Sequence, residues 1–260
     1  EGVIITDAMD MHAIRQGEFL GADAVRGIQA GLELLLLTSN PDDQARVYQA
    51  LVQARDAHAF DVDALAASAR RVAALKNWVV SETDMPDLSV VGCADHQQVA
   101  DAIAEASITL VRDQRCLLPL RLAPDQRIAV IVPRPRDLTP ADTSSYIVPA
   151  LAGSMRAYHP RVDEFVIPSA PDEADIAAVL EQISGYDLVL IGTLHAYNQP
   201  GQQALVREVL RTGIPTVVTA LRLPYDLMVF PEAPTYVCTY SILEPSMRAL
   251  AKMLFGNIPF

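Results

Sequence analysis

The sequence predicts an α/β protein that ends in an open three-layer α/β/α sandwich. Beyond Pro124, short apolar strands alternate with amphipathic helices. The strands Ile128–Val132 and Leu188–Ile191 are continuous apolar runs, typical of strands buried on both faces of a parallel sheet. A separate βαβ segment opens the chain. These three observations define the predicted fold class.

The opening segment reads Glu1-Gly2-Val3-Ile4-Ile5-Thr6-Asp7-Ala8-Met9-Asp10-Met11. Its apolar run, Val3–Ile5, predicts a strand buried on both faces that ends at Asp7. A second strand is expected over Leu32–Thr38, after an amphipathic segment. In α/β folds, ligands bind at the carboxyl ends of the strands, so Asp7 stands where chemistry is expected.

Two helices are expected next, one through Val47 to Val52 and one from Asp61 to Val79, because apolar residues recur at helical spacing. Residues 81–87 lack periodicity and predict an extended linker. A helix (Val99 to Ala106) and a strand (Ile108–Val111) should follow.

In the sandwich, we expect a helix over Ser144–Tyr158 and one with Ser169 as its cap. The final helix should begin at Pro245 and end at Gly256. The remaining expected elements are strands at Phe165–Ile167, Ile214–Leu221 and Thr235–Tyr240 and a helix through Leu205 to Leu210.

The stretch Thr6-Asp7-Ala8-Met9-Asp10-Met11 resembles a motif of the bacterial β-N-acetylglucosaminidases of glycoside hydrolase family 3. The resemblance continues through Ala30-Gly31-Leu32-Glu33, Leu221-Arg222-Leu223-Pro224-Tyr225-Asp226-Leu227 and Leu254-Phe255-Gly256. It implies that the chain is a C-terminal fragment of such an enzyme. Residues 1–80 would be the last strands and helices of a (β/α)8 barrel, 81–119 a connecting segment, and 120–260 the sandwich domain.

In that family the Asp of the motif is the glycosyl nucleophile, which implies this role for Asp7. A retaining glycosidase needs an ionised nucleophile and a general acid/base, and a strand end holds a carboxylate rigidly. A strand-end Asp also commonly caps the next helix, and position alone favours that structural role for Asp7. The resemblance favours the catalytic one. Asp10 and Met11 would then line the sugar pocket.

The acid/base is expected upstream of this chain. In the relatives it is a His paired with an Asp on a barrel loop, and no Lys-His-Phe-Pro-Gly-His-Gly stretch occurs here. His12 lies near Asp7, but a solvent-facing or packing role is the better interpretation. In another branch of the family a Glu of the C-terminal domain serves; the loop-borne candidates Glu232 and Glu244 lack the flanking motif.

Other polar residues have two open interpretations. His195-Ala196-Tyr197-Asn198 follows a buried strand and could line the domain interface or form an ordinary polar loop. Arg222 and Tyr225-Asp226 match the family pattern, and we interpret them as structural.

Composition excludes several classes. A net charge of −12 argues against a nucleic-acid partner, and no apolar run approaches the roughly 18 residues of a membrane span. The expected partners are a carbohydrate substrate and the missing N-terminal barrel portion. Cys93, Cys116 and Cys238 lack metal-ligand spacing, so neither a disulfide framework nor a metal is expected, and no cofactor is implied. A cytoplasmic location is expected, with secretion an open alternative.

The resemblance thus implies part of a retaining glycosidase that removes terminal β-linked N-acetylglucosamine from cell-wall or chitin-type oligosaccharides. The alternatives are a family 3 β-glucosidase or β-xylosidase, or a non-catalytic accessory domain. A nucleotide-binding module is disfavoured because Pro133-Arg134-Pro135-Arg136 offers no Gly-rich turn. A serine hydrolase is excluded because no Gly-x-Ser-x-Gly elbow exists.

Overall fold

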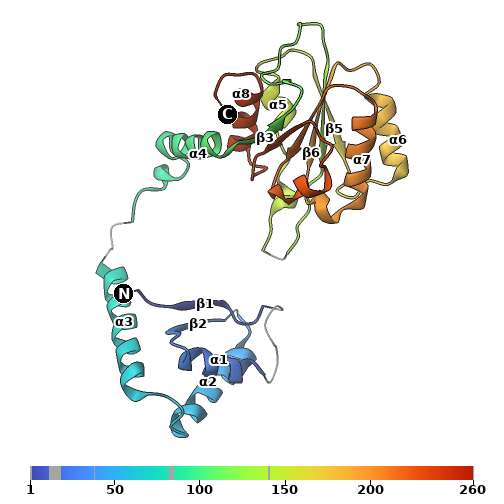
Figure 1. The fold of residues 1–260 in the computed structure, drawn as a ribbon. Helices are drawn as coiled ribbons and strands as arrows, with labels where there is room; N and C mark the ends of the chain where they lie inside the picture. The colour runs from blue at the N-terminus through green and yellow to red at the C-terminus, as the bar shows by residue number, and fades with distance from the viewer. Residues whose placement is uncertain (1, 12–18, 38, 82–84, 140, 260) are drawn as a thin grey trace. The chain divides into compact units, whose positions relative to one another are not determined.

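The chain divides into two compact units, Glu1–Leu88 and Ser89–Phe260 (Figure 1). The structure is a computed structural model that describes residues 2–11, 19–37, 39–81, 85–139 and 141–259. His12 and much of the predicted linker therefore lie outside the described residues.

The first unit is a βαβ arrangement in which two parallel strands, β1 (Ile5–Ala8) and β2 (Leu34–Leu36), form a two-stranded sheet. Its helices are α1 (Phe19–Gln29), α2 (Pro41–Asp56) and α3 (Val62–Ser81). A small core joins the turn after β1 to α1 and α2, and its buried members among the described residues are Met9, Leu20, Ala24 and Val47.

The expectation of a first strand buried on both faces is wrong for the described first unit. The strand begins at Ile5 rather than Val3, and the side chains of Ile4 and Ile5 are 56% and 55% exposed. β1 has β2 as its one hydrogen-bonded neighbour, so a single strand covers one of its edges and no further layer covers its apolar side chains. The run Val3–Ile5 is apolar enough for the interior of a sheet, but the described residues around it do not form such an interior.

The second unit is built on a six-stranded mixed sheet with the order β3-β8-β7-β6-β4-β5. All neighbouring pairs are parallel except β3 and β8, which are antiparallel. The strands are β3 (Thr109–Asp113), β4 (Ile128–Pro133), β5 (Val162–Ile167), β6 (Leu188–Thr193), β7 (Thr216–Ala220) and β8 (Thr235–Cys238). The helices are α4 (Ala94–Ser107), α5 (Leu151–Met155), α6 (Glu173–Gln182), α7 (Pro200–Arg211) and α8 (Glu244–Leu254).

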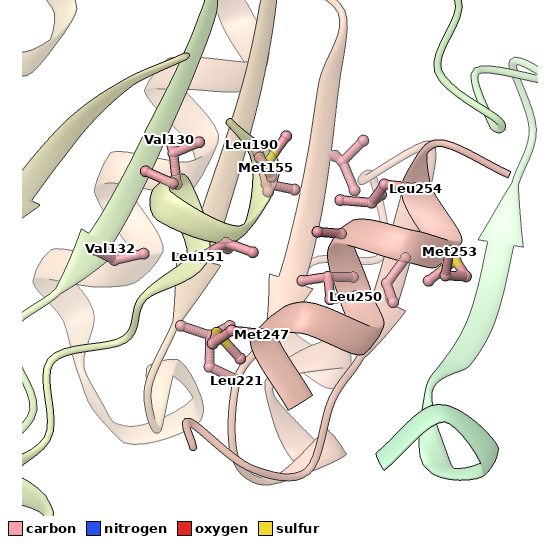
Figure 2. Packing of buried hydrophobic residues seen from close by; sticks show 14 of the residues in the cluster. Val130, Val132, Leu151, Met155, Leu190, Leu221, Met247, Leu250, Met253 and Leu254 are labelled. Atoms are coloured by element: carbon pink, nitrogen blue, oxygen red, sulfur yellow. The ribbon is translucent and has the colours of Figure 1, made fainter. Parts of the chain in front are cut away.

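Helices cover both faces of this sheet, which confirms the predicted three-layer α/β/α class. Along β4, Val130 belongs to one core with α5 and α8, whereas the next residue, Ile131, belongs to the other with α6 and α7. Figure 1 shows these two pairs of helices on opposite sides of the sheet. This alternation is the period of two that a strand imposes on its side chains. Figure 2 shows the first core, in which the labelled residues are Val130, Val132, Leu151, Met155, Leu190, Leu221, Met247, Leu250, Met253 and Leu254.

The helix expected over Ser144–Tyr158 is broken in the structure. A 3₁₀ turn, Ser144–Tyr146, is followed by extended chain and by the short helix α5. Pro149 explains the break, because a proline disfavours helical backbone at the residue before it. The cap of α6 also differs from the expected Ser169. Asp172 forms a capping box with Asp175, which satisfies two otherwise free backbone N–H groups.

Residues 94–113 lie in the second unit, although the sequence analysis assigned 81–119 to a connecting segment. β3 pairs with β8 from Thr109↔Cys238 to Asp113↔Thr235. α4 packs on α8 and is joined to it by the ion pairs Asp101–Arg248 and Glu105–Lys252. The boundaries inferred from the sequence, after residue 80 and after residue 119, remain a prediction.

Candidate functional site

Asp7 lies in β1, one residue before the strand ends at Ala8. Its carboxylate is exposed, and Oδ1 accepts a hydrogen bond from the backbone N–H of Ala8 at 2.7 Å. The carboxylate is therefore held by its own strand end and remains open to a ligand.

The loop after Asp7 is tied to β2. The N–H of Met9 donates to the carbonyl of Leu36 at 2.9 Å, and the N–H of Leu36 donates to Thr6 Oγ1 at 2.8 Å. Met9 is buried in the small core, which fixes the backbone between Asp7 and the two predicted pocket residues. Of these, Asp10 is half-buried and Met11 is exposed.

Glu33 is a further carboxylate close to β1, but it lies at the opposite end of the strand from Asp7. It accepts from the N–H of Ile4 at 3.0 Å and pairs with Arg71. The hydrogen bond from Arg71 holds the pKa of Glu33 below its usual value. A hollow at this end of the unit is lined by Glu33 and Arg71, and Asp7 does not line it. The hollow therefore lies away from the Asp7 carboxylate. Glu33 is not placed to act with Asp7.

The two glutamates weighed as acid/base candidates make surface ion pairs. Glu232 lies 3.2 Å from Arg207, and Glu244, in the first turn of α8, lies 2.6 Å from Arg248. Their environments are those of charged residues on helix ends and surfaces.

In the second unit the structure brings polar residues together at the carboxyl edge of the parallel strands. Asp226 is buried, with 1% of its surface exposed, and accepts from Thr193 Oγ1 at 2.7 Å and from the N–H of Tyr197 at 3.0 Å. These bonds give Asp226 a structural role. Arg222 lies near it in sequence and pairs with Asp142, with 3.3 Å between Nη1 and Oδ2.

Sequence reasoning did not identify a crevice at this edge. Its walls are the loop after β4, Ser169, Leu194, His195, Gln199 and Arg222. The lining residues come from four loops far apart in the chain. The signal available in the sequence was that each of these loops directly follows an apolar strand.

The described residues lack two kinds of feature. No group of three or more His, Cys, Asp or Glu side chains in the described ranges could hold a metal ion. None of the described helices is long and apolar enough to cross a membrane.

The fold defines an α/β protein whose six-stranded mixed sheet, flanked by helices, matches the C-terminal domain of glycoside hydrolase family 3 enzymes. Among solved structures, the chain is similar to a glycoside hydrolase family 3 β-N-acetylglucosaminidase from Paenibacillus sp. strain FPU-7, at 26% identity and a TM-score of 0.83 over 99% of this chain and 49% of that one. It is similar to a fungal multi-domain family 3 β-N-acetylglucosaminidase at 26% identity and a TM-score of 0.78, over 99% of this chain and 29% of that one.

A β-glucosidase from Listeria innocua shares the fold, at 17% identity and a TM-score of 0.71 over 99% of this chain and 39% of its own. No protein-family model and no curated protein matched the sequence. The chain thus spans less than half the length of each of these structural neighbours.

Proposed function

We propose that the chain is the C-terminal part of a retaining family 3 glycoside hydrolase that removes terminal β-linked N-acetylglucosamine from cell-wall or chitin-type oligosaccharides, with Asp7 as its nucleophile. One observation carries the proposal. The Thr6-to-Met11 motif ends a parallel strand, with the Asp7 carboxylate exposed, in a chain similar over 99% of its length to family 3 β-N-acetylglucosaminidases.

The chemistry follows from a carboxylate held at a strand end. Asp7 attacks the anomeric carbon while the glycosidic C–O bond breaks and the leaving alcohol takes a proton from the general acid. Water, deprotonated by the same acid/base, then displaces the Asp7 carboxylate from the covalent glycosyl-enzyme with net retention. The backbone N–H of Ala8 orients the attacking carboxylate. Asp10 and Met11 follow directly and are expected to contact the bound sugar. The acid/base is expected in the rest of the barrel.

The exposed apolar surface of the first unit supports this part of the proposal. Four apolar side chains are more than half exposed: Ile4 and Ile5 at the start of β1, and Trp78 and Val80 on α3. We expect the other strands and helices of a (β/α)8 barrel to cover them, because a filled barrel interior takes about eight strands.

The nucleophile assignment is tested in the longer enzyme that carries this chain. Asp7→Ala should abolish turnover of an aryl N-acetylglucosaminide, and added azide should restore it and yield the α-glycosyl azide, because azide takes the place of the carboxylate. Asp10→Ala is the matched control and should show no azide rescue. A β-configured azide product, or rescue of the control alone, would contradict the assignment of Asp7.

The substrate is tested with the same enzyme on paired aryl glycosides. The N-acetylglucosaminide should be the better substrate by kcat/KM than the glucoside and the xyloside. A preference for the glucoside would instead identify a β-glucosidase, like the fold neighbour from Listeria innocua.

The 260-residue chain by itself should show little hydrolysis. Loss of a general acid alone costs roughly 10²–10⁴ in rate, and loss of the pocket's positioning adds to this. The assay compares the purified chain with its Asp7→Asn variant on an aryl N-acetylglucosaminide. Turnover well above the variant's, from a preparation shown by mass to contain only this chain, would show that the chain itself contains an acid/base. The candidates would then be His12, Glu232 and Glu244.

A further inference from the structure

The strand that carries Asp7 is irregular at Asp7 itself. In the pairing of β1 with β2, Ile5 lies opposite Leu34 and Ala8 lies opposite Leu36. Two residues of β1 therefore face a single residue of β2, which is a β-bulge. Bulges are rare between parallel strands and frequent next to active sites, where they turn a side chain in a new direction.

The hydroxyl of Thr6 bonds across this bulge. Its Oγ1 accepts a hydrogen bond from the backbone N–H of Leu36 at 2.8 Å. A side-chain acceptor thus joins the ladder at the place where the two backbones shift out of register. Threonine suits this position, because its β-branched side chain favours a strand and its hydroxyl supplies the acceptor.

Leu36 holds the chain on both sides of Asp7. Its N–H donates to Thr6, which precedes Asp7, and its carbonyl accepts from the N–H of Met9, which follows Asp7, at 2.9 Å. Met9 is also buried in the small core, whereas Asp7 is exposed. The direction of the Asp7 side chain therefore depends on bonds that the residues around it make with β2.

The beginning of β1 has a separate anchor. Glu33 accepts a hydrogen bond from the N–H of Ile4 at 3.0 Å and pairs with Arg71. The extra residue of the bulge lies beyond this anchor, between Ile5 and Ala8. The anchor alone therefore does not fix the backbone at Asp7, and the bond made by Thr6 is needed.

We propose that Thr6 is a positioning residue of the glycosidase, whose hydroxyl holds the β-bulge that aims the Asp7 carboxylate. This inference rests on the proposed function of Asp7 as the nucleophile. A reacting group must be held within about 0.5 Å of its productive position, and a misplacement of about 1 Å can cost roughly 10² in rate. Thr6 acts through Asp7, because its own hydroxyl is engaged with β2.

The first test uses the longer enzyme that carries this chain, with an aryl N-acetylglucosaminide as substrate. Thr6→Val keeps the size and branching of the side chain but lacks the acceptor, and it should lower kcat roughly 10–100-fold with little change in KM. Thr6→Ser retains the hydroxyl and should recover most of the parent kcat. Thr143→Val, at an exposed threonine of the second unit, is the matched control and should behave as the parent enzyme does.

The second test needs no activity and uses the purified 260-residue protein. Hydrogen exchange at the Leu36 amide should be roughly fivefold faster in Thr6→Val than in the parent, as expected for the loss of one hydrogen bond. Exchange in Thr6→Ser should stay close to that of the parent. The Ile4 amide, which is bound to Glu33, should exchange at the same rate in all three proteins and shows that the first unit remains folded.

Failure of this proposal and failure of the proposed function give different results. A Thr6→Val enzyme with the parent kcat, beside an inactive Asp7→Ala, would overturn the role of Thr6 and leave Asp7 as the nucleophile. Thr6→Ser as impaired as Thr6→Val would also overturn it, because the methyl group rather than the hydroxyl would then matter. Turnover in Asp7→Ala would refute the proposed function, and unchanged exchange at Leu36 in Thr6→Val would refute the contact across the bulge in either case.

Discussion

Asp226 links three segments at the carboxyl edge of the second sheet. It lies in the 3₁₀ segment Pro224–Val229 and accepts from the hydroxyl of Thr193, at the end of β6, and from the N–H of Tyr197 in the following turn. A buried carboxylate is tolerated when its oxygens are hydrogen-bonded. Its two bonds therefore hold in place the loop that carries His195.

Asp226→Ala should destabilise the second unit. The substitution leaves the donors of Thr193 and Tyr197 without their acceptor, at a cost of about 1–3 kcal/mol for each buried donor. Urea unfolding followed by far-UV circular dichroism measures the loss. Asp125→Ala, at an exposed aspartate, is the control and should stay close to the parent protein. Equal stability of the two variants would contradict a structural role for Asp226.

His195 should make stability depend on pH in one direction. Its pKa is lowered in the folded protein, chiefly by burial and then by the positive charges of Arg222 and Arg136, whereas the carboxylates of Asp226 and Asp142 oppose this and raise it. As pH falls below the unfolded value of about 6.5, the unfolded ring takes up a proton that the folded ring resists. The free energy of unfolding should therefore fall with decreasing pH.

The measurement compares the parent protein with His195→Gln in urea at slightly alkaline and at mildly acidic pH. The parent should lose more stability than the variant between the two conditions. An identical loss in both proteins would show that other groups carry the pH dependence.

At the scale of the element, the start of α7 depends on close backbone approach. A Cβ on Gly201 would lie 2.0 Å from the carbonyl oxygen of Pro171, and backbone cannot yield as a flexible side chain does. α7 follows Gln199 with Pro200 in its first turn, so the helix enters against the segment that precedes α6. The contact sets the spacing between these two elements.

Gly201→Ala should therefore destabilise the second unit by about 1–3 kcal/mol or more, the usual cost of overpacking. Gly153→Ala in α5 is the matched control, because its Cβ meets nothing within 4 Å. This control should be neutral or stabilising by about 0.5–1 kcal/mol, since alanine favours helix over glycine. Thermal unfolding of both variants decides the comparison, and a tolerated Gly201→Ala would contradict it.

At the scale of the whole molecule, the two units differ in the cores they hold. The second unit has one extensive core on each face of its sheet. In the first unit α3 has no buried residue, and the buried core has four members. Stability in an α/β fold comes from covering both faces of the sheet, which the second unit does by itself.

A truncated protein spanning residues 89–260 should unfold cooperatively, with a midpoint close to that of the second unit in the full chain. Trp78 is the single tryptophan and lies in α3, so its fluorescence reports the first unit alone. That signal should change at lower denaturant than the circular dichroism of the second unit. If residues 89–260 show no cooperative transition while the full chain does, the boundary is wrong.

Local patterns allowed most of the fold to be predicted. Apolar runs located the inner strands β4, β6, β7 and β8, because strands buried on both faces leave no alternation to obscure them. The edge strands β3 and β5 are partly exposed, and the predicted runs covered only part of each. Besides the cap of α6, two expectations failed for identifiable reasons. Pro149 interrupts the helix expected over Ser144–Tyr158, and the run Val3–Ile5 was apolar without having layers to cover it.

The sequence by itself determined the α/β class, the strand–helix alternation and the position of Asp7, because these depend on residues close together in the chain. The tertiary structure alone decided that β3 joins the sheet beside β8 and that Asp226 is buried. It also decided that Arg134, His195 and Arg222 share one crevice. The reason is physical: the strand order β5-β4-β6-β7 brings together loops that are tens of residues apart, and that order depends on the packing of whole elements rather than on any local pattern.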